Sequence, residues 1–407
     1  MNVSLFVSKK IIKSNKSDYS RNIVKIAIST IAVCVMVMLL SIFIVFGFKH
    51  TIEDKVIGFT GDVSILPITL NNSFETASIS LNDETLQLLK EDDRVTHLCR
   101  YAHKTGILKT QDAIEGVVLY GVSEDYSLDC FTGEILQGTF PTYTYNGTPN
   151  DSVVISATTA NKLNLKVGEK ISMYFVKNDS PAVRRFIIAG IYDSGFVDYD
   201  ELYVFGDLKH IQKLNNWNND MVSGYHVFLQ KHDDASDYSM SANKLLDFST
   251  TTRTYYQINP QVFDWLNLQD VNVSLLLTLM AVVCIITVIS IMIILVIEKT
   301  SMIGVLKALG MNNLTIRKIF IQKSLYLTIL GVIIGNLLAV VVSLLQLKFN
   351  FVRLSPESYY MSTVPIEFNL LAIIIVDIAT IAICTLAMIA PSLLISKINP
   401  IASIKNE

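Results

Sequence analysis

The hydrophobic positions of this chain are gathered into four long runs, at residues 26–48, 273–297, 324–347 and 368–395. An α-helix rises about 1.5 Å per residue and the hydrocarbon core of a bilayer is about 30 Å thick, so roughly 20 apolar residues span it. All four runs reach that length, and more than two hundred residues of mixed sequence separate the first from the second. The pattern predicts an α-helical membrane protein with four transmembrane helices and a large extramembrane domain inserted between helices 1 and 2.

The inserted domain is predicted to be mixed α/β. Segments rich in Val, Ile, Tyr and Phe between turn residues are typical of strands, and apolar residues every three or four positions are typical of helices. We expect helices at 83–91, 157–164 and 235–247, and loops at 143–151 and 215–220. We expect strands at 62–70, 116–121, 152–156, 170–176, 185–192 and 225–230.

The composition agrees with a membrane protein, since 51% of the residues are hydrophobic and 17% are charged. The net charge of −3 and the lack of a strongly basic patch argue against nucleic acid as a partner. About 25 residues precede the first run, which is longer than the 7–15 apolar residues of a signal peptide. We therefore expect a permanent anchor helix.

The five cysteines fall into two groups. Cys34, Cys284 and Cys384 lie inside apolar runs, where a thiol packs as a small hydrophobic side chain. Cys99 and Cys130 lie in the inserted domain, where they either form a disulfide, if that domain faces an oxidising compartment, or stay two separate thiols. Their spacing does not decide between the two.

The distribution of lysine and arginine predicts the orientation. Residues 1–25 carry five lysines and one arginine against Asp18, and the link 298–323 carries four lysines and one arginine against Glu298. Because such residues stay on the cytoplasmic side, we expect cytoplasmic termini, with the large domain and the loop 348–367 outside. Residues 1–22 form either a basic amphipathic helix on the inner membrane surface or a positive tail without defined structure.

The motifs of several enzyme classes are absent. The chain has no G-x-x-x-x-G-K-[ST] phosphate loop, no H-E-x-x-H and no G-x-S-x-G, so it lacks the residues for binding ATP in that loop and for zinc-protease or serine-hydrolase chemistry. His97, Cys99 and His103 have no obvious fourth ligand, so we expect no metal site. Asp377 lies inside the last apolar run, where an acid either faces the helix bundle, or is protonated there, or takes part in transport.

A short amphipathic segment follows the second run. Met302, Ile303, Leu306 and Leu309 recur at helical spacing, Gly310 is a plausible end, and Asn312 or Asn313 is a plausible restart. A helix this short needs a surface for its apolar stripe. That surface is either the lipid headgroups or a cytoplasmic partner protein.

This segment, EKTSMIGVLKALGMNNLTIRKIF (298–320), resembles the coupling segment of FtsX-like ABC-transporter permeases, the group that includes MacB, and within it is most similar to the lipoprotein-releasing permeases of the Lol system. The resemblance covers nearly the whole chain. Its other parts are VFGFKHTIEDKVIG (45–58), FTGEILQG (131–138), ANKLNLKVGEKI (160–171), IAGIYDSGFVDYDELYVF (188–205), YYMSTVPIEF (359–368) and APSLLISKINPIASIKNE (390–407).

The resemblance implies a protein of the bacterial inner membrane whose chain is divided into nine segments. They are a cytoplasmic amphipathic basic segment (1–22), transmembrane helix 1 (23–48), a periplasmic MacB-like α/β domain (49–269), transmembrane helix 2 (270–297), a cytoplasmic coupling segment (298–317), transmembrane helix 3 (318–347), a periplasmic loop (348–367), transmembrane helix 4 (368–395) and a cytoplasmic tail (396–407).

The resemblance also implies a non-catalytic permease subunit. ATP and Mg²⁺ would be used by a separate cytoplasmic ABC ATPase dimer, with no cofactor bound by this chain. Two permease protomers, the same or related, would pair. The ATPase would contact Thr300, Met302, Ile303, Gly304, Leu306, Lys307, Leu309 and Gly310.

In permeases of this kind an acylated lipoprotein is extracted from the outer leaflet of the inner membrane and passed to a periplasmic carrier. The implied lipid cavity involves Ile42, Val45, Phe46, Leu275, Leu276 and Leu279. The implied carrier-binding hook is the turn formed by Lys177, Asn178, Asp179, Ser180, Pro181, Ala182, Val183 and Arg184, although these residue types also suit an ordinary hairpin turn.

Two alternatives stay open. One is a MacB-like exporter or mechanotransmission permease for another envelope substrate. The other is a regulator in which motion driven by an ATPase activates a cell-wall hydrolase.

Overall fold

The computed structural model describes residues 18–69, 74–75, 77–110, 113–126, 131, 133–144, 147–177, 180–355 and 359–397. The N-terminal residues 1–17, the tail from 398 and Cys130 lie outside this part of the chain, and with them most of the predicted basic segment. The chain divides into a helical unit (Met1–Lys49, Leu266–Val352 and Val364–Glu407) and an α/β unit (His50–Trp265 and Arg353–Thr363).

The helices are α2 (Asp18–Thr60), α3 (Asp83–Lys90), α4 (Ala157–Leu163), α5 (Val197–Leu202), α6 (Leu208–Asn215), η2 (His232–Asp234), α7 (Ala235–Ala242), α8 (Tyr255–Ile258), α9 (Pro260–Glu298), α10 (Thr300–Ala308), α11 (Asn313–Phe349), α13 (Leu370–Ala387), α14 (Ile389–Ser392) and α15 (Leu394–Lys397). The strands are β1 (Val63–Pro67), β2 (Val95–Lys109), β3 (Ile114–Val122), β4 (Glu134–Gly138), β5 (Ser152–Ser156), β6 (Lys170–Lys177), β7 (Ser180–Asp193), β8 (Tyr203–Asp207), β9 (Gly224–Leu229) and β10 (Thr250–Thr254).

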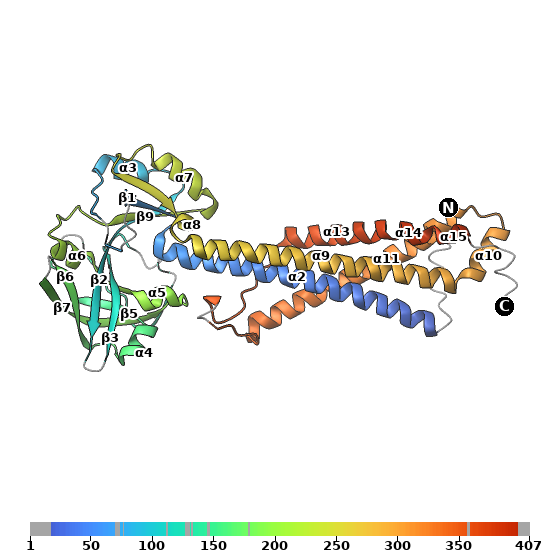
Figure 1. The fold of residues 1–407 in the computed structure, drawn as a ribbon, viewed down its shortest axis with the longest axis horizontal. Coiled ribbons are helices and arrows are strands. Elements are labelled where there is room, and N and C mark those ends of the chain that lie inside the picture. Colours follow the sequence, from blue (N-terminus) through green and yellow to red (C-terminus); the bar gives the residue numbers. More distant parts are fainter. Residues whose placement is uncertain are drawn as a thin grey trace. The chain divides into compact units, whose positions relative to one another are not determined.

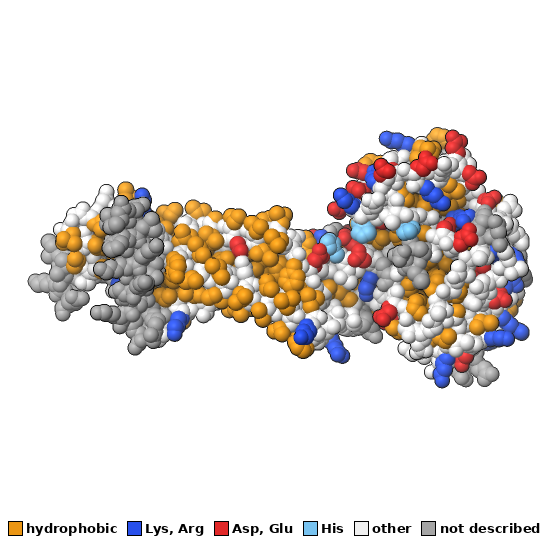
Figure 2. Space-filling view, turned by 180° about the vertical axis from the view of Figure 1, so that it is seen from behind, with side chains coloured by type: hydrophobic (Ala, Val, Ile, Leu, Met, Phe, Trp, Pro, Cys, Tyr) orange, Lys and Arg blue, Asp and Glu red, His pale blue; other side chains and the backbone are white. Residues whose placement is uncertain are grey.

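The four predicted long apolar helices are confirmed. The stretches Val24–Thr60, Pro260–Glu298, Asn313–Phe349 and Leu370–Ser396 are long and apolar enough to cross a membrane, and they lie side by side (Figure 1). Hydrophobic side chains cover the visible face of this unit (Figure 2). A chain with such a surface belongs in a bilayer, because soluble proteins rarely expose large continuous apolar patches.

Two glycines let α2 and α11 approach closely. A Cβ at Gly331 would lie 2.7 Å from Cγ2 of Ile31, and one at Gly335 would lie 2.8 Å from the carbonyl oxygen of Ala32. Small residues four positions apart allow such backbone contact between membrane helices.

The core of the helical unit contains three thiols. Cys34 of α2, Cys284 of α9 and Cys384 of α13 are buried in one hydrophobic cluster, as predicted for cysteines in apolar runs. Each of these three helices therefore contributes a cysteine to the shared core.

The α/β unit contains one ten-stranded sheet in the order β10-β1-β9-β2-β3-β8-β5-β7-β4, with β6 paired to both β2 and β7. Through β6, six strands close into a ring in the order β2-β3-β8-β5-β7-β6. Aromatic side chains fill its interior, among them the fully buried Phe175, Phe186 and Phe205. A closed ring leaves few exposed strand edges for unwanted pairing.

The predicted strands and helices of this unit are all present, with ends shifted by a few residues. Strands β2, β4, β8 and β10 and helices α5, α6 and α8 were not predicted. Strand β2 carries His97, Arg100, His103 and Lys104, which hide its alternation. The Lys104 side chain is nevertheless buried, because its Nζ lies 2.7 Å from the Glu75 carboxylate.

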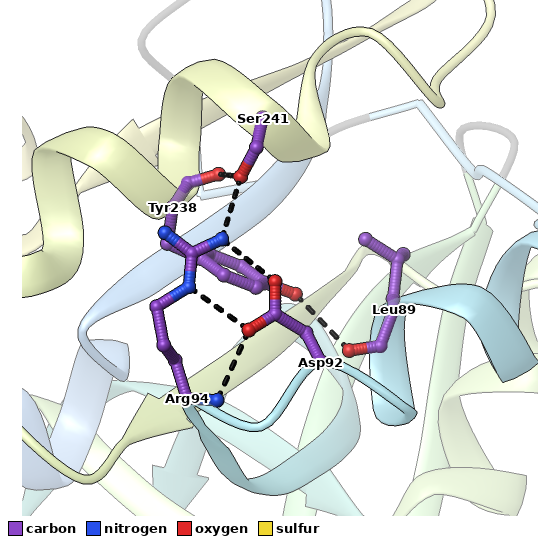
Figure 3. Close-up of polar contacts among 5 residues, drawn as sticks. All are labelled: Leu89, Asp92, Arg94, Tyr238 and Ser241. Carbon is purple, nitrogen blue, oxygen red and sulfur yellow. Dashed lines mark hydrogen bonds and ion pairs between the residues drawn. The ribbon is translucent and has the colours of Figure 1, made fainter.

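A smaller lobe consists of β10, β1 and β9 with α3 and α7 (Figure 1). Arg94, just before β2, connects Asp92, in the turn after α3, to α7 (Figure 3). Its guanidinium contacts both Asp92 carboxylate oxygens, at 2.9 and 2.7 Å, and donates to Ser241 Oγ at 3.0 Å. The same group lies 5.3 Å from the ring centre of Tyr238, whose hydroxyl donates to the Leu89 carbonyl.

A buried carboxylate lies where α2 enters this lobe. Asp62 is fully buried, and its Oδ2 accepts a hydrogen bond from the Leu229 N–H at 2.8 Å. Its Oδ1 lies 2.5 Å from His232 Nδ1, and His232 Nε2 lies 3.5 Å from Asp54. The hydrogen bonds to Asp54 and Asp62 raise the pKa of His232 to about 10. The imidazole is therefore a cation at neutral pH.

Candidate functional site

Helix α10 is the short helix predicted after the second apolar run. It ends at Ala308, and Gly310 follows with φ +83°, a left-handed conformation that favours glycine. Asn312 then caps α11, its side chain accepting from the Leu314 N–H at 3.3 Å. The predicted stop and restart are confirmed.

The inner face of α10 is covered by the chain itself. Ile303 is fully buried, and Met302 and Leu306 pack against the same cluster, which includes Leu295 of α9 and Phe320 of α11. The prediction that the whole apolar stripe needs an external surface is wrong for these three residues. Sequence spacing showed that they share a face, but not that α9 and α11 would cover it.

The outer face of α10 and the turn after it remain apolar and exposed. Val305 is 46% exposed and Leu309 is 79% exposed, and Leu314 at the start of α11 is 60% exposed. Among the predicted contact residues, Gly304 is buried and Lys307 donates to the Ser396 carbonyl at 3.3 Å. Thr300 donates to the carbonyls of the last turn of α9, so α10 is held at its beginning as well.

The predicted lipid-cavity residues do not form one surface within a protomer. Ile42 is buried in the helical core, whereas Leu275 and Leu279 are 66% and 51% exposed. Phe46 is also exposed, and Val45 and Leu276 are half-buried. Ile42 was misplaced because the apolar run 26–48 has no polar face to show which side is buried.

One face of α9 forms an exposed apolar stripe. Val271, Leu275, Leu279 and Val282 recur at helical spacing and line a shallow groove with Ser274, Thr278 and Asp270. At one end of the stripe, Asp270 pairs with Lys49 of α2 at 2.7 Å. Two of the predicted cavity residues, Leu275 and Leu279, therefore lie on this exposed stripe.

A separate cavity lies between α9 and α13. It has a volume of about 290 Å³, roughly twice that of an apolar cavity that holds benzene. Its lining residues are Met38, Leu277, Thr278, Ala281, Cys284, Ile375, Val376, Ala379, Thr380, Ile383 and Cys384. Sequence reasoning missed it, because only the packing of α9 against α13 creates the space.

Asp377 has a partner on the neighbouring helix. Its Oδ2 accepts a hydrogen bond from Asn336 Nδ2 of α11 at 2.7 Å. The polar pair joins α11 to α13 within their apolar stretches, which matches the prediction of a bundle-facing acid. Asn336, a polar residue inside an apolar run, was the signal that sequence reasoning did not use.

The predicted hook is a strand ribbon rather than a loop. Strands β6 and β7 pair as far as Lys177 and Ser180, which leaves Asn178 and Asp179 between them, outside the described residues. Pro181, Ala182, Val183 and Arg184 all belong to β7. The hydrogen-bonded ribbon is thus longer than the predicted strands.

One side of this ribbon is apolar and exposed near its end. Val176 is 70% exposed and opposes Pro181, and Val183 is 43% exposed and opposes Tyr174. In the next strand Ile107 opposes Tyr174 and is 45% exposed. Because opposed residues share a face of the sheet, these side chains form one patch.

Cys99 is buried in β2, and its thiol donates to the Asp125 carbonyl at 3.0 Å. His97 and His103 lie on the same strand. Within the described part of the chain, no group of three or more His, Cys, Asp or Glu residues is arranged to hold a metal ion.

Comparisons with known proteins agree with this architecture. Residues 26–242 match the family model of the MacB-like periplasmic core domain, and residues 274–400 match that of the FtsX-like permease C-terminal region. The "Lipoprotein-releasing system transmembrane protein LolC" of Xylella fastidiosa strain Temecula1 is 18% identical over 93% of this chain and 92% of its own. The protein of the same name from strain 9a5c is 20% identical over 56% of each chain.

Among solved structures, the periplasmic region of MacB from Actinobacillus actinomycetemcomitans covers 49% of this chain and 91% of its own, with 15% identity and a TM-score of 0.35. The extracellular domain of the ABC-type transporter YknZ from Gram-positive bacteria covers 47% and 99%, with 16% identity and a TM-score of 0.34. The two family models together span both units, and the first alone covers more than half of the chain. The chain therefore belongs to the family of ABC-transporter permeases that combine a MacB-like periplasmic core domain with an FtsX-like permease C-terminal region.

Proposed function

We propose that this permease is the membrane subunit of a lipoprotein-releasing transporter in the bacterial inner membrane. ATP hydrolysed by a separate subunit drives extraction of acylated lipoproteins from the outer leaflet, and a periplasmic carrier receives them. The observation that carries the proposal is the end-to-end match to a protein named as a lipoprotein-releasing permease, over 93% of this chain and 92% of that one.

The outer face of α10 suits the docking of an ATPase. Val305, Leu309 and Leu314 offer exposed apolar contact, while Ile303 anchors the helix to α9 and α11. A displacement of α10 by the ATPase would therefore also displace α9 and α11, on which α10 packs. The chain has no phosphate-binding loop of its own, so ATP and Mg²⁺ belong to the partner.

The exposed stripe of α9 suits acyl chains. Each CH₂ group moved from hydrocarbon to water costs about 0.8 kcal/mol, so extraction needs an apolar surface along the route. Val271, Leu275 and Leu279 provide it, and a second permease protomer, the same or related, would close it from the other side.

The patch at the end of the β6–β7 ribbon suits the carrier. Val176, Pro181 and Val183 are exposed there, and Arg185 and Lys109 lie in the adjoining row of the same sheet face. Apolar contact with cations beside it fits a soluble protein with an apolar site and acidic residues next to it.

The proposed orientation follows the lysine and arginine distribution. Both termini and α10 lie in the cytoplasm, and the α/β unit lies in the periplasm. This arrangement puts the ATPase surface and the carrier surface on opposite sides of the membrane.

The test is affinity purification in mild detergent with a photo-reactive amino acid at Leu279, followed by mass spectrometry. The matched control carries the same group at Leu337 of α11, which is also exposed, at 64%. We expect an ATPase in both preparations and acylated lipoproteins cross-linked through position 279 only.

Other outcomes would contradict the proposal. An ATPase without lipoproteins, together with lost export of another substrate, would favour a MacB-like exporter. An ATPase with a cell-wall hydrolase and no carrier would favour the hydrolase regulator. Equal cross-linking at both positions would mean that Leu279 merely faces bulk lipid.

A further inference from the structure

Residues 353–363, between α11 and α13, belong to the α/β unit, although both flanking helices belong to the helical unit. This segment folds back on itself, with Arg353 opposite Thr363 and the Leu354 N–H donating to the Ser362 carbonyl at 2.9 Å. Within it Tyr360 has φ +56°, a left-handed conformation that is unfavourable for a side chain of this size. Such a conformation persists only where the surroundings hold it.

Two aromatic rings hold the side chain of Tyr360. Its ring stacks on Phe196, with centroids 4.5 Å apart and planes at 11°. Trp265, in the first turns of α9, meets the same ring edge-on at 6.0 Å. Both arrangements are among the favoured geometries of aromatic pairs.

A single ammonium group holds the backbone of Tyr360. Lys55 Nζ of α2 donates to the carbonyl of Tyr360 and to that of Gly195, each at 3.0 Å. Gly195 has φ +64°, and a Cβ there would lie 2.5 Å from Nζ. Another residue at this position would strain the left-handed backbone and displace the Lys55 ammonium group from its present place.

The contacts continue into the core of the α/β unit. Phe196 stacks on Tyr199 of α5 at 4.7 Å, and Tyr199 meets Phe59 in the last turn of α2 at 4.5 Å. The Tyr199 hydroxyl donates to Asn259 Oδ1, just before α9, at 2.9 Å. We name the group Lys55, Phe196, Tyr199, Trp265 and Tyr360 the aromatic clasp.

We infer that the aromatic clasp makes residues 353–363 move together with α2, α9 and α5, and that Tyr360 is the positioning residue of the clasp. The inference rests on the proposed function for the source of the motion. Without the clasp, a shift of α11 or α13 would be lost in the 353–363 segment. With the clasp in place, the same shift is passed through Tyr360 to Phe196 and then to α5 of the α/β unit.

The tryptophans make this motion measurable. The chain has two, Trp217 and Trp265, so a Trp217→Phe background leaves a single reporter inside the clasp. The permease is purified with its ATPase in nanodiscs, and Trp265 emission is recorded with and without ATP and Mg²⁺. We expect a nucleotide-dependent change in the background protein and in Tyr360→Phe, which keeps the ring, and no change in Tyr360→Ala.

Measuring the rate of ATP hydrolysis distinguishes a positioning role of Tyr360 from a general folding defect. In Tyr360→Ala we expect hydrolysis within about twofold of the background and release of cargo lowered about tenfold or more, since the motor runs without moving the α/β unit. Phe248→Ala removes a fully exposed ring of the same unit and should match the background in every measurement. A full nucleotide response and full release in Tyr360→Ala would overturn the inference.

A second measurement needs no ATPase. Hydrogen–deuterium exchange of the purified permease alone should be about tenfold faster at 194–202 in Tyr360→Ala than in the background or in Phe248→Ala. Unchanged exchange there would overturn the clasp. Failure to co-purify an ATPase would count against the proposed function instead, and exchange would then decide on the clasp alone.

Discussion

Replacing His232 with glutamine should destabilise the α/β unit, and by an amount that depends on pH. The imidazolium lies 2.5 Å from Oδ1 of the fully buried Asp62, whose Oδ2 accepts from the Leu229 N–H. Glutamine can restore a hydrogen bond but not the positive charge. The substitution therefore leaves a buried carboxylate without its nearest cation.

The size of the effect follows from burial. Breaking a buried ion pair costs about 3–5 kcal/mol. The His232 side chain is 40% exposed, and solvent screening together with the new amide reduces the loss to about 1–2 kcal/mol. In a unit of this size, 1 kcal/mol shifts Tm by about 2–4 °C, so we expect Tm to fall by about 2–8 °C at pH 6.

The pH dependence has a definite sign. The pKa of His232 is raised to about 10 in the folded state, above its ordinary value of about 6.5. A raised histidine pKa contributes stability that is complete below about pH 6.5 and is lost as the pH rises towards 10. The difference in Tm between the wild type and His232→Gln should therefore shrink between pH 6.5 and 10.

The assay is thermal unfolding of the full-length permease in detergent, followed by tryptophan fluorescence. Trp217 and Trp265 both lie in the α/β unit, so the signal reports on that unit. Lys231→Gln, an exposed neighbouring cation, is the control and should leave Tm within about 1 °C. An equal Tm difference at pH 6 and pH 10, or the same loss in the control, would refute the reasoning.

Three further changes test other parts of the molecule. Gly304→Pro should uncouple ATP hydrolysis from transport, because proline disrupts a helix interior by about 3 kcal/mol or more; normal cargo release by the reconstituted complex would exclude a coupling role for α10. Gly138→Ala should lower Tm by several degrees, since Gly138 has φ +76° and a Cβ would lie 2.1 Å from the Ala189 carbonyl oxygen; unchanged thermal unfolding would contradict the described backbone. Val176→Asp should weaken carrier binding about tenfold at unchanged Tm, because this side chain is 70% exposed at the end of the ribbon; undiminished binding in a pull-down would remove the ribbon from the carrier surface.

The sequence predicted which helices and strands form better than which of their residues are buried. Four long apolar runs leave little choice but four long helices, and Val- and Ile-rich segments bounded by turn residues became strands. Strand β2 was not predicted, because a lysine such as Lys104 indicates a surface position unless its ion pair with Glu75 is known. That ion pair joins positions 29 residues apart, and no local pattern reveals it.

The site residues show the same limit. Helical spacing placed Met302 and Ile303 on one face of α10, but it could not say that the chain's own α9 and α11 cover that face. Ile42 was assigned to a cavity from an apolar run with no polar side, and it is buried instead. Tyr360 was quoted only as part of a motif, because its left-handed backbone and its contacts with Lys55 and Phe196 arise from tertiary structure.

The position of β1 between β9 and β10 also bears on how the protein is made. Val63 of β1 pairs with Thr254 of β10, about 190 residues later in the chain. At 5–20 residues per second, a ribosome needs about 10–40 s to make the intervening sequence. For most of that time β1 lacks both of its partner strands, because Val227 of β9, which also pairs with Val63, comes about 160 residues after it. Val63 and Ile65, which are fully buried in the finished fold, stay uncovered until then. The nascent chain must therefore be shielded from proteases and from aggregation until β10 emerges, and synthesis that stops before Thr254 leaves a fragment that cannot complete its sheet.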